Sequence, residues 1–360
     1  MALDPFYAKA LEDSQWKVDQ SYEAIFDWNY SDDRADLLNL YSKGKSMQWD
    51  GEHRLDWDVE LEYGNPMGLP EYLFPLAGAE FYEKMSVEDK KLCRQHQQAW
   101  VNSQFLHGEQ GALLCSAKIV TNVPDCEAKF YASTQVIDEA RHVEVYKRFI
   151  EKLGLAYPIT GPLKTLLDQV LCDSRWDMTY LGMQVVIEGL ALAAFSNIRD
   201  QAENPLAAAL NAYVMQDEAR HVAFGRLALR EYYPELMEHE RNEREEFLVE
   251  ACYLMRDRFQ ALEVWENLGL PMKECVHHLD NSQGMAMFRT HLFSRIVPIV
   301  KDIGLWGDKI VDGYTKMGIL GYANVDVEAM QEDDMRIAAE HDARRQHVDS
   351  TIALGETAAE

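Results

Sequence analysis

The sequence predicts an all-α protein organised around a four-helix bundle, and three observations support this fold class. The stretch Asp-Glu-Ala-Arg-His-Val occupies residues 138–143 and recurs unchanged at residues 217–222, 79 positions later. Long segments with helical periodicity surround both copies, and several begin with typical helix-start residues such as Ser86 and Asn204. No clear β-strand alternation or glycine-rich phosphate loop occurs in the chain.

Composition excludes several classes of partner. The 360 residues carry 35 Lys and Arg against 61 Asp and Glu, a formal net charge of -26, which disfavours nucleic acid and anionic membranes as partners. The N-terminus has no signal-peptide core, and no stretch of membrane-spanning length is free of charges. We therefore expect a soluble cytoplasmic protein. The cysteines lack zinc-type spacing and are expected to be reduced core residues, namely Cys93, Cys115, Cys126, Cys172, Cys252 and Cys275.

Residues 1–85 are predicted to form N-terminal helices and a covering loop. Residues 1–30 show helix-like periodicity with many aromatic side chains, and Ser31 has the character of an N-cap for a helix running toward Ser42. Residues 44–70 break this pattern but retain Trp49 and Trp57. Because large aromatics are rarely left in water, we expect an ordered loop lying over the body of the protein.

Residues 86–231 are predicted to be the metal-binding four-helix bundle. A first helix runs from Ser86 to Thr121, and the turn Asn122-Val123-Pro124-Asp125 opens a second that runs to Gly154. A shorter helix follows residue 162, a third long helix covers about 176–202, and a fourth begins at 204–205 and ends before residue 234. Additional helices of the same domain fill 232–322, beginning with one charged helix over 235–267. The polar tail 323–360 is expected to be partly disordered.

The duplicated motif carries the chemistry. Glu139 and His142 lie three residues apart, as do Glu218 and His221, and on a helix this spacing places both side chains on one face, able to reach one ion. Glu109 and Glu188 are separated by the same 79 residues as the two motifs. A single offset therefore relates three candidate ligands to three others.

The hairpin geometry supports this assignment. Two antiparallel helices bring residues level when the turn lies midway between them, and the midpoints fall at Pro124 and Glu203, inside the two predicted turns. Glu188 also lies in an otherwise apolar stretch, where an unpartnered carboxylate would be costly. A lone Glu-x-x-His pair is common on helix surfaces by chance. The duplication together with the matched glutamates is what favours a dimetal site.

The donor set indicates the metals. Four carboxylates and two neutral imidazoles balance two divalent ions, and oxygen-rich sites with imidazole suit iron or manganese. Asp138 and Asp217 are positioned to accept the other ring N–H of the opposite motif's histidine. Arg141 and Arg220 are expected to form buried salt bridges that stiffen the bundle.

These residues resemble the ferritin-like dimetal carboxylate superfamily. The fuller Asp-Glu-x-Arg-His form looks most like the hydroxylase subunits of bacterial multicomponent monooxygenases, and the run from Tyr41 to Trp49, followed by Asp56-Trp57, is similar to a segment near the start of those and related oxygenases. Two departures stand out. Those hydroxylases usually have threonine where this chain has Leu192, and the related arylamine N-oxygenases have a third histidine where it has Val214.

Two alternatives stay open at this point. The ribonucleotide reductase small subunit has a radical-forming tyrosine four residues after its first histidine ligand, the position of Tyr146 here, although the tail lacks the aromatic residue through which that subunit passes its radical on. Ferritin-like iron-handling proteins form the other class, but they need little beyond four helices. The long segments before and after the predicted bundle favour an enzyme with a covered substrate pocket.

The resemblance implies a di-iron monooxygenase, with an Mn/Fe pair as the alternative cofactor and O2 as co-substrate. Its small-molecule substrate is expected to be largely apolar, and hydroxylation is the first choice, with desaturation and N-oxidation as variants. Two external electrons imply a reductase or ferredoxin partner, and a homodimer is a family expectation. Positions one turn from the ligands are expected to line the pocket: Phe105, Leu113, Gln135, Tyr146, Gln184, Leu192 and Val214.

Overall fold

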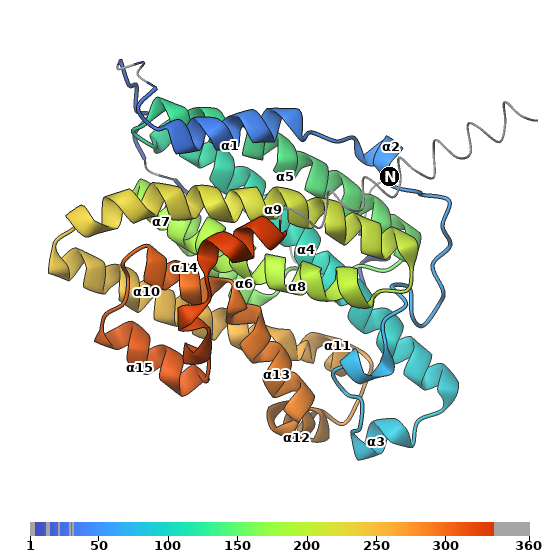
Figure 1. Ribbon diagram of the computed structural model, residues 1–360. Helices are drawn as coiled ribbons and strands as arrows, with labels where there is room; N and C mark the ends of the chain where they lie inside the picture. Colours follow the sequence, from blue (N-terminus) through green and yellow to red (C-terminus); the bar gives the residue numbers. More distant parts are fainter. Residues whose placement is uncertain (1–3, 12–14, 21, 29, 31, 335–360) are drawn as a thin grey trace, which may run out of the picture.

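The computed structural model describes residues 4–334 except 12–14, 21, 29 and 31, and within this part the chain is helical without a β-strand (Figure 1). A single isolated bridge joins Tyr7 and Ala156. The predicted all-α class is confirmed.

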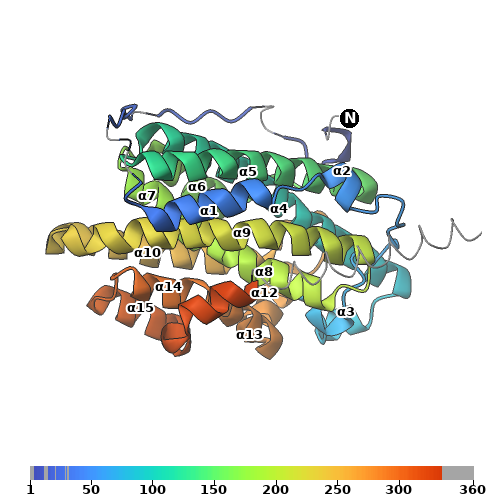
Figure 2. The ribbon, with the colours of Figure 1, turned by 45° about the horizontal axis from the view of Figure 1, so that its top comes forward.

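Two helical hairpins form the central bundle. Helices α4 (Val87–Asn122) and α5 (Cys126–Leu153) make the first hairpin. The second joins α7 (Trp176–Tyr180), the π-helical η3 (Leu181–Ile187) and α8 (Glu188–Gln201) to α9 (Pro205–Tyr232). Figures 1 and 2 show these helices running side by side.

The predicted helix boundaries of the bundle are confirmed by their caps. The Ser86 hydroxyl accepts the backbone N–H of Asp89 at the start of α4, and the Asn204 side chain accepts two backbone N–H groups at the start of α9. Gly154 ends α5 with φ 66°, a left-handed conformation that glycine adopts without strain. These helix ends could be predicted from single residues because each cap bonds to backbone groups within one helical turn.

The third bundle helix differs from the prediction of one regular helix over 176–202. The π-helical stretch η3 widens it immediately before Glu188. π-Helical turns occur frequently at functional sites. Gly225 on α9 accommodates this stretch, because a Cβ atom at that position would lie 2.5 Å from Cβ of Gln184.

The helix formed by Trp176–Gln201 is long and apolar enough to cross a membrane by composition alone. Of its most apolar stretch of 18 residues, 89% is buried inside the protein, as in the core helix of a bundle.

Further helices cover two sides of the bundle. Helix α1 (Ala35–Ser46) lies on α5 and α9, and the short α2 (Gly51–Arg54) follows it (Figure 2). Helix α6 (Gly161–Cys172) packs against α4, where Nζ of Lys118 donates to the carbonyls of Val170 and Leu171 at 2.8 and 3.1 Å. The loop between α2 and α4 contains η2 (Glu71–Leu73) and α3 (Glu80–Glu83).

The C-terminal helices close the side of η3 and α8. They are η4 (Tyr233–Glu235), α10 (Glu238–Asp257), η5 (Arg258–Gln260), α11 (Leu262–Asn267), α12 (Met272–Asn281), α13 (Gln283–His291), η6 (Leu292–Ser294), α14 (Ile296–Asp302), α15 (Asp308–Met317) and η7 (Leu320–Asn324). The single helix predicted over 235–267 is wrong. It breaks at η5 and at Ala261, whose φ is 50°, and no glycine or proline marks this break.

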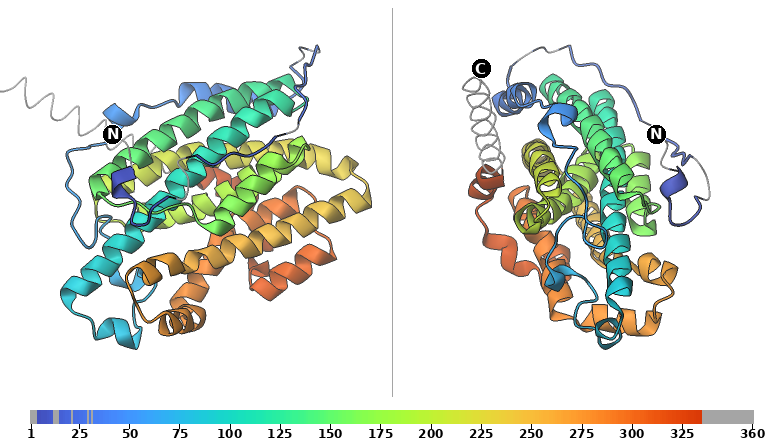
Figure 3. Two further views of the ribbon diagram at one scale, coloured as in Figure 1. Left: turned by 180° about the vertical axis from the view of Figure 1, so that it is seen from behind. Right: turned by 90° about the vertical axis from the view of Figure 1, so that its right-hand side faces the viewer.

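The predicted N-terminal helix over residues 1–30 is also wrong for the described residues. Apart from η1 (Asp4–Phe6), this segment follows the bundle in an irregular path (Figure 3), with Ala8 N–H bonded to the Ala156 carbonyl and Ile25 N–H to that of Thr121. Backbone pairing with distant segments replaces helical hydrogen bonds there. Ser31 lies outside the described residues, and α1 extends past Ser42 to Ser46.

The first part of the tail packs against the C-terminal helices and the bundle. Asp334 pairs with Arg295, and Gln331 accepts from Arg226. The predicted partial disorder of the tail is not tested, because residues 335–360 lie outside the described part. All six cysteines are free, as expected, but Cys172 is exposed whereas the other five are buried.

Gly225→Ala should destabilise the protein, because the added methyl group would push η3 away from α9. We expect a loss of about 1–3 kcal/mol in the free energy of unfolding, measured by urea denaturation. Gly284→Ala on α13 is the control, since its nearest neighbour is the Ser282 hydroxyl at 3.7 Å. Equal stability of the two variants would show that η3 is not constrained by α9.

Candidate dimetal centre

The structure brings the six predicted ligands together inside the bundle. One group consists of Glu109, Glu139, His142 and Glu218, and a second consists of Glu139, Glu188 and His221. Within each group the potential ligand atoms all lie within 4.8 Å of one another, and every member is buried. Glu139 belongs to both groups, so the two groups form one continuous site.

The two histidines have equivalent orientations. Nδ1 of His142 lies 3.2 Å from Oε2 of Glu109 and 3.1 Å from Oε1 of Glu218, while its Nε2 lies 3.1 Å from Oδ2 of Asp217. Nδ1 of His221 lies 3.1 Å from Oε1 of Glu139, and its Nε2 lies 3.3 Å from Oδ2 of Asp138. Each ring therefore directs Nδ1 toward the carboxylates and Nε2 toward the aspartate of the opposite motif, as the sequence predicted.

The two aspartates are held by buried cations. Arg141 pairs with both Asp138 and Asp217, at 2.9 Å from the latter, and Arg220 pairs with Asp217 and lies 3.6 Å from Asp138. These cross-links between α5 and α9 match the salt bridges expected of the arginines. They also fix the aspartates that orient the histidines.

The loop after α1 adds two residues that sequence reasoning missed. Nε1 of Trp49 donates to Oδ2 of Asp217 at 2.7 Å, and Nε2 of Gln48 donates to Oδ1 of Asp138 at 2.7 Å. Both belong to the Tyr41–Trp49 run that carried the resemblance. The resemblance of this run was therefore the one sequence feature that could have pointed to Gln48 and Trp49. The spacing of the residues does not show that the run reaches the site.

The electrostatics of these side chains reflect an excess of buried negative charge. Burial and the neighbouring Glu218 raise the pKa of Glu109 to about 8, and the same two causes raise the pKa of Glu188 well above its ordinary value. Burial alone would lower the pKa of His142, but hydrogen bonds with Asp217 and Glu109 hold it well above the usual range. Divalent cations would compensate this charge.

Two ligand atoms, Oε2 of Glu188 and Oε2 of Glu218, have no hydrogen-bond partner among the described residues. Leaving a buried polar atom unsatisfied costs about 1–3 kcal/mol. These atoms belong to residues of the two groups, and oxygen and imidazole donors of this kind bind iron or manganese. The residues present therefore fit a pair of divalent metal ions.

Most of the predicted pocket residues do not line a cavity at the site. Of those seven, only Phe105 does so. Gln135 donates from Nε2 to Glu139 at 3.0 Å and to Glu188 at 2.8 Å, so it contacts the candidate ligands. Nε2 of Gln184 donates in turn to Oε1 of Gln135 at 3.5 Å. Leu113 is only partly buried, whereas Leu192 and Val214 are core residues.

Tyr146 is a core tyrosine in this structure. Its hydroxyl donates to Oδ1 of Asn211 at 3.1 Å, and its ring contacts Phe105 and Phe195. Burial, Glu109 and Glu218 raise its pKa well above the ordinary value, so the phenol keeps its proton.

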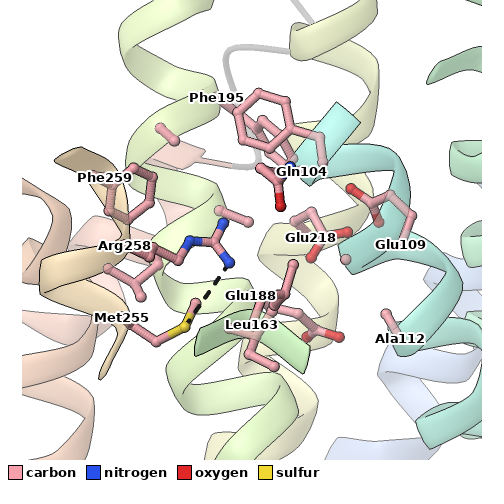
Figure 4. A pocket seen from close by; sticks show the side chains of 16 residues that line it. Gln104, Glu109, Ala112, Leu163, Glu188, Phe195, Glu218, Met255, Arg258 and Phe259 are labelled. Carbon is pink, nitrogen blue, oxygen red and sulfur yellow. Dashed lines mark hydrogen bonds between the residues drawn. The ribbon is translucent and has the colours of Figure 1, made fainter. Parts of the chain in front are cut away.

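A small cavity adjoins the carboxylates of Glu109, Glu188 and Glu218, and we call it the inner chamber. It has a volume of about 30 Å3 and is bounded by Glu109, Glu188 and Glu218 on one side and by residues of α10 and η5 on the other (Figure 4). Its further walls are mainly apolar and include Ala112, Leu163, Ala191, Phe195, Met255 and Phe259. Positions one turn from Glu109 and Glu188 supply part of this lining, but Met255, Arg258 and Phe259 come from outside the bundle.

The family model for p-aminobenzoate N-oxygenase AurF matches residues 31–304. The chain belongs to this family. It is therefore an oxidoreductase that acts through a dimetal centre, an oxygenase or oxidase of the ferritin-like superfamily. Val214, which the sequence analysis identified as a departure from the third histidine of the arylamine N-oxygenases, is buried.

No curated protein matches the chain. Among solved structures, variants of an R2-like ligand-binding oxidase with a reconstituted Mn/Fe cofactor are similar at 15% sequence identity. One covers 78% of this chain and 96% of its own, with a TM-score of 0.46, and another covers 87% and 95%, with a TM-score of 0.41.

Glu188→Ala and His221→Ala should each reduce metal binding, because each removes one donor from a buried group of three. We expect about two iron ions per wild-type chain and about one or fewer per variant, measured by metal analysis after anaerobic loading. Glu144→Ala, an exposed glutamate on α5, is the control. Full iron content in both variants would contradict the assignment.

Proposed function

We propose that this chain is an O2-dependent dimetal oxygenase that oxidises a small, largely apolar organic substrate. The observation that carries this proposal is the inner chamber, where an apolar cavity opens directly onto Glu109, Glu188 and Glu218. A substrate group in this chamber would lie next to the metal pair and away from water.

The proposed metal ligands are the carboxylates of Glu109, Glu139, Glu188 and Glu218 and Nδ1 of His142 and His221. Two iron ions are the first choice and an Mn/Fe pair the alternative. When bound, such a pair supplies the electrons and Lewis acidity needed to activate O2.

The chain itself positions and protects this centre. Gln135 holds Glu139 and Glu188 by one amide group, and the two aspartates fix the tautomers of the histidines so that Nδ1 is free to bind metal. Phe105, Leu163 and Phe195 exclude water from the chamber.

Hydroxylation is the proposed reaction, and N-oxidation of an amine is the variant that the family's name supports. Insertion of one oxygen atom from O2 and reduction of the other to water consumes two electrons beyond those of the substrate. We therefore propose a reductase or ferredoxin as electron donor.

Two observations separate this proposal from its alternatives. The hydroxyl of Tyr146 is engaged by Asn211 rather than by a candidate ligand, which disfavours a radical role. A ferroxidase site would need a polar route for Fe(II), whereas the chamber that reaches this centre is mainly apolar.

Single-turnover oxidation tests the proposal. Iron-loaded, chemically reduced protein is mixed with 18O2 and either 4-aminobenzoate or octanoate, and product is analysed by mass spectrometry. We expect an organic product carrying one labelled oxygen atom, and loss of product in Glu188→Ala. Oxidation of many added Fe(II) ions per chain without organic product would show a ferroxidase instead, and a tyrosyl radical lost in Tyr146→Phe would support the radical alternative.

A further inference from the structure

Arg258 lies in the wall between the inner chamber and a second cavity. This second cavity, which we call the surface cavity, has a volume of about 380 Å3 and includes the exposed Asp257 and the partly exposed Lys9 in its lining. The rest of its lining comes from residues 157–162 and 260–263. Among the described residues, Arg258 alone lines both cavities, and it is only 9% exposed.

A different wall separates the inner chamber from a third cavity. This cavity, which we call the outer cavity, has a volume of about 540 Å3 and shares Phe105, Ala194 and Phe259 with the inner chamber. The three shared residues are apolar. The inner chamber therefore has an apolar wall toward the outer cavity and a cationic wall toward the surface cavity.

Polar groups without a partner line the surface cavity. Among the described residues, Nε of Arg258 and Oγ1 of Thr160 have no hydrogen-bond partner, although Thr160 is only 6% exposed. Nη1 of Arg258 contacts the sulfur of Met255 at 3.9 Å. Buried polar groups of this kind are normally satisfied by water. The surface cavity is therefore suited to hold water as far inward as the guanidinium.

Negative charges lie on both sides of Arg258. The metal-site glutamates face it from the inner chamber (Figure 4), whereas Asp257 and Glu263 line the surface cavity. Asp257 accepts Nε of Arg256 at 2.6 Å, and Glu263 accepts the indole N–H of Trp100 at 2.6 Å. Burial lowers the pKa of Arg258 to about 10 and Glu263 opposes this shift, so the side chain remains a cation at neutral pH. The guanidinium is thus attracted from both sides.

Gln104 connects the walls of the two cavities. Its side chain lines the inner chamber, and its Nε2 donates to the carbonyl of Pro158 at 2.9 Å. Its Oε1 accepts the backbone N–H of Thr160 at 2.9 Å. Pro158 and Thr160 both line the surface cavity. One amide therefore fixes the loop of the surface cavity to the inner chamber, and the boundary between the two cavities is polar.

We propose that Arg258 forms the constriction of a polar port through which protons and single water molecules pass between solvent and the metal centre. The buried guanidinium fills the opening and keeps bulk water outside. Its positive charge opposes the passage of metal cations, so the port does not serve as a route for Fe(II).

The proposed function requires such a route. In hydroxylation, the substrate C–H bond, O2, two electrons and two protons give one C–OH group and one water molecule. Protons must therefore enter the buried centre, and water must leave it, in each turnover. The inference rests on the proposed function for this use of the port, but the port itself can be tested without turnover.

Azide entry tests the port. Azide is a small polar anion that gives ferric ions a visible absorption band when it binds, so stopped-flow absorbance of oxidised, iron-loaded protein yields its association and dissociation rates. Gly161 lines the surface cavity, and a Cβ atom there would meet no other atom within 4 Å. Gly161→Phe should fill the cavity and slow both rates about 10-fold with Kd unchanged, because a blocked route does not alter the bound state.

Gly284→Phe is the matched control. Gly284 lines the outer cavity, and its nearest neighbour is the Ser282 hydroxyl at 3.7 Å. Both azide rates should stay at the wild-type value. Arg258→Met should slow both rates, because the constriction loses its polar lining, and Arg258→Lys should keep most of the wild-type rate. Iron content and circular dichroism show whether each variant folds and binds metal.

Wild-type rates in both Gly161→Phe and Arg258→Met, or equal slowing in Gly284→Phe, would overturn the proposal. A weaker Kd with an unchanged association rate in Arg258→Met would also overturn it, because Arg258 would then act on the bound anion and not on its path. Failure of the proposed function would look different. Azide would still enter through the port, but the reduced iron-loaded protein would give no labelled product.

Discussion

The balance of buried charge at the centre of the bundle is the constraint on which the rest of the structure depends. Four glutamates and two aspartates lie within one apolar interior, where unpaired carboxylates would be too costly to keep ionised. Arg141 and Arg220 neutralise the aspartates, while the raised pKa values of Glu109 and Glu188 show that the protein itself leaves these two glutamates uncompensated. The unbalanced charge is what makes the site a receptor for metal cations.

This requirement explains the layers around the bundle. Helix α1 and the loop after it cover one side, so that Trp49 and Gln48 donate to the two aspartates from outside the bundle. The C-terminal helices cover the other side and leave the inner chamber between η5 and the glutamates. One cover therefore fixes the ligands, and the other shapes the space in which a substrate would meet the metals.

Much of the bundle could be predicted from the sequence because its signals are local. Ser86, Asn204 and Gly154 mark helix ends through hydrogen bonds within a single turn. The break at Ala261 could not be predicted, since alanine favours helix and no neighbouring residue interrupts the periodicity. The π-helical stretch before Glu188 could not be predicted either, because it depends on the space that Gly225 leaves on another helix.

The sequence by itself determined the all-α class, the pairing of the hairpins and the convergence of six candidate ligands. Two spacings were enough for this: three residues within each motif and 79 between equivalent positions. Only the tertiary structure decided where the chamber lies and which side chains face it. Met255, Arg258 and Phe259 line it because α10 and η5, which follow the bundle in the sequence, pack against it. The hydrophobic periodicity of the chain does not predict contacts between such segments.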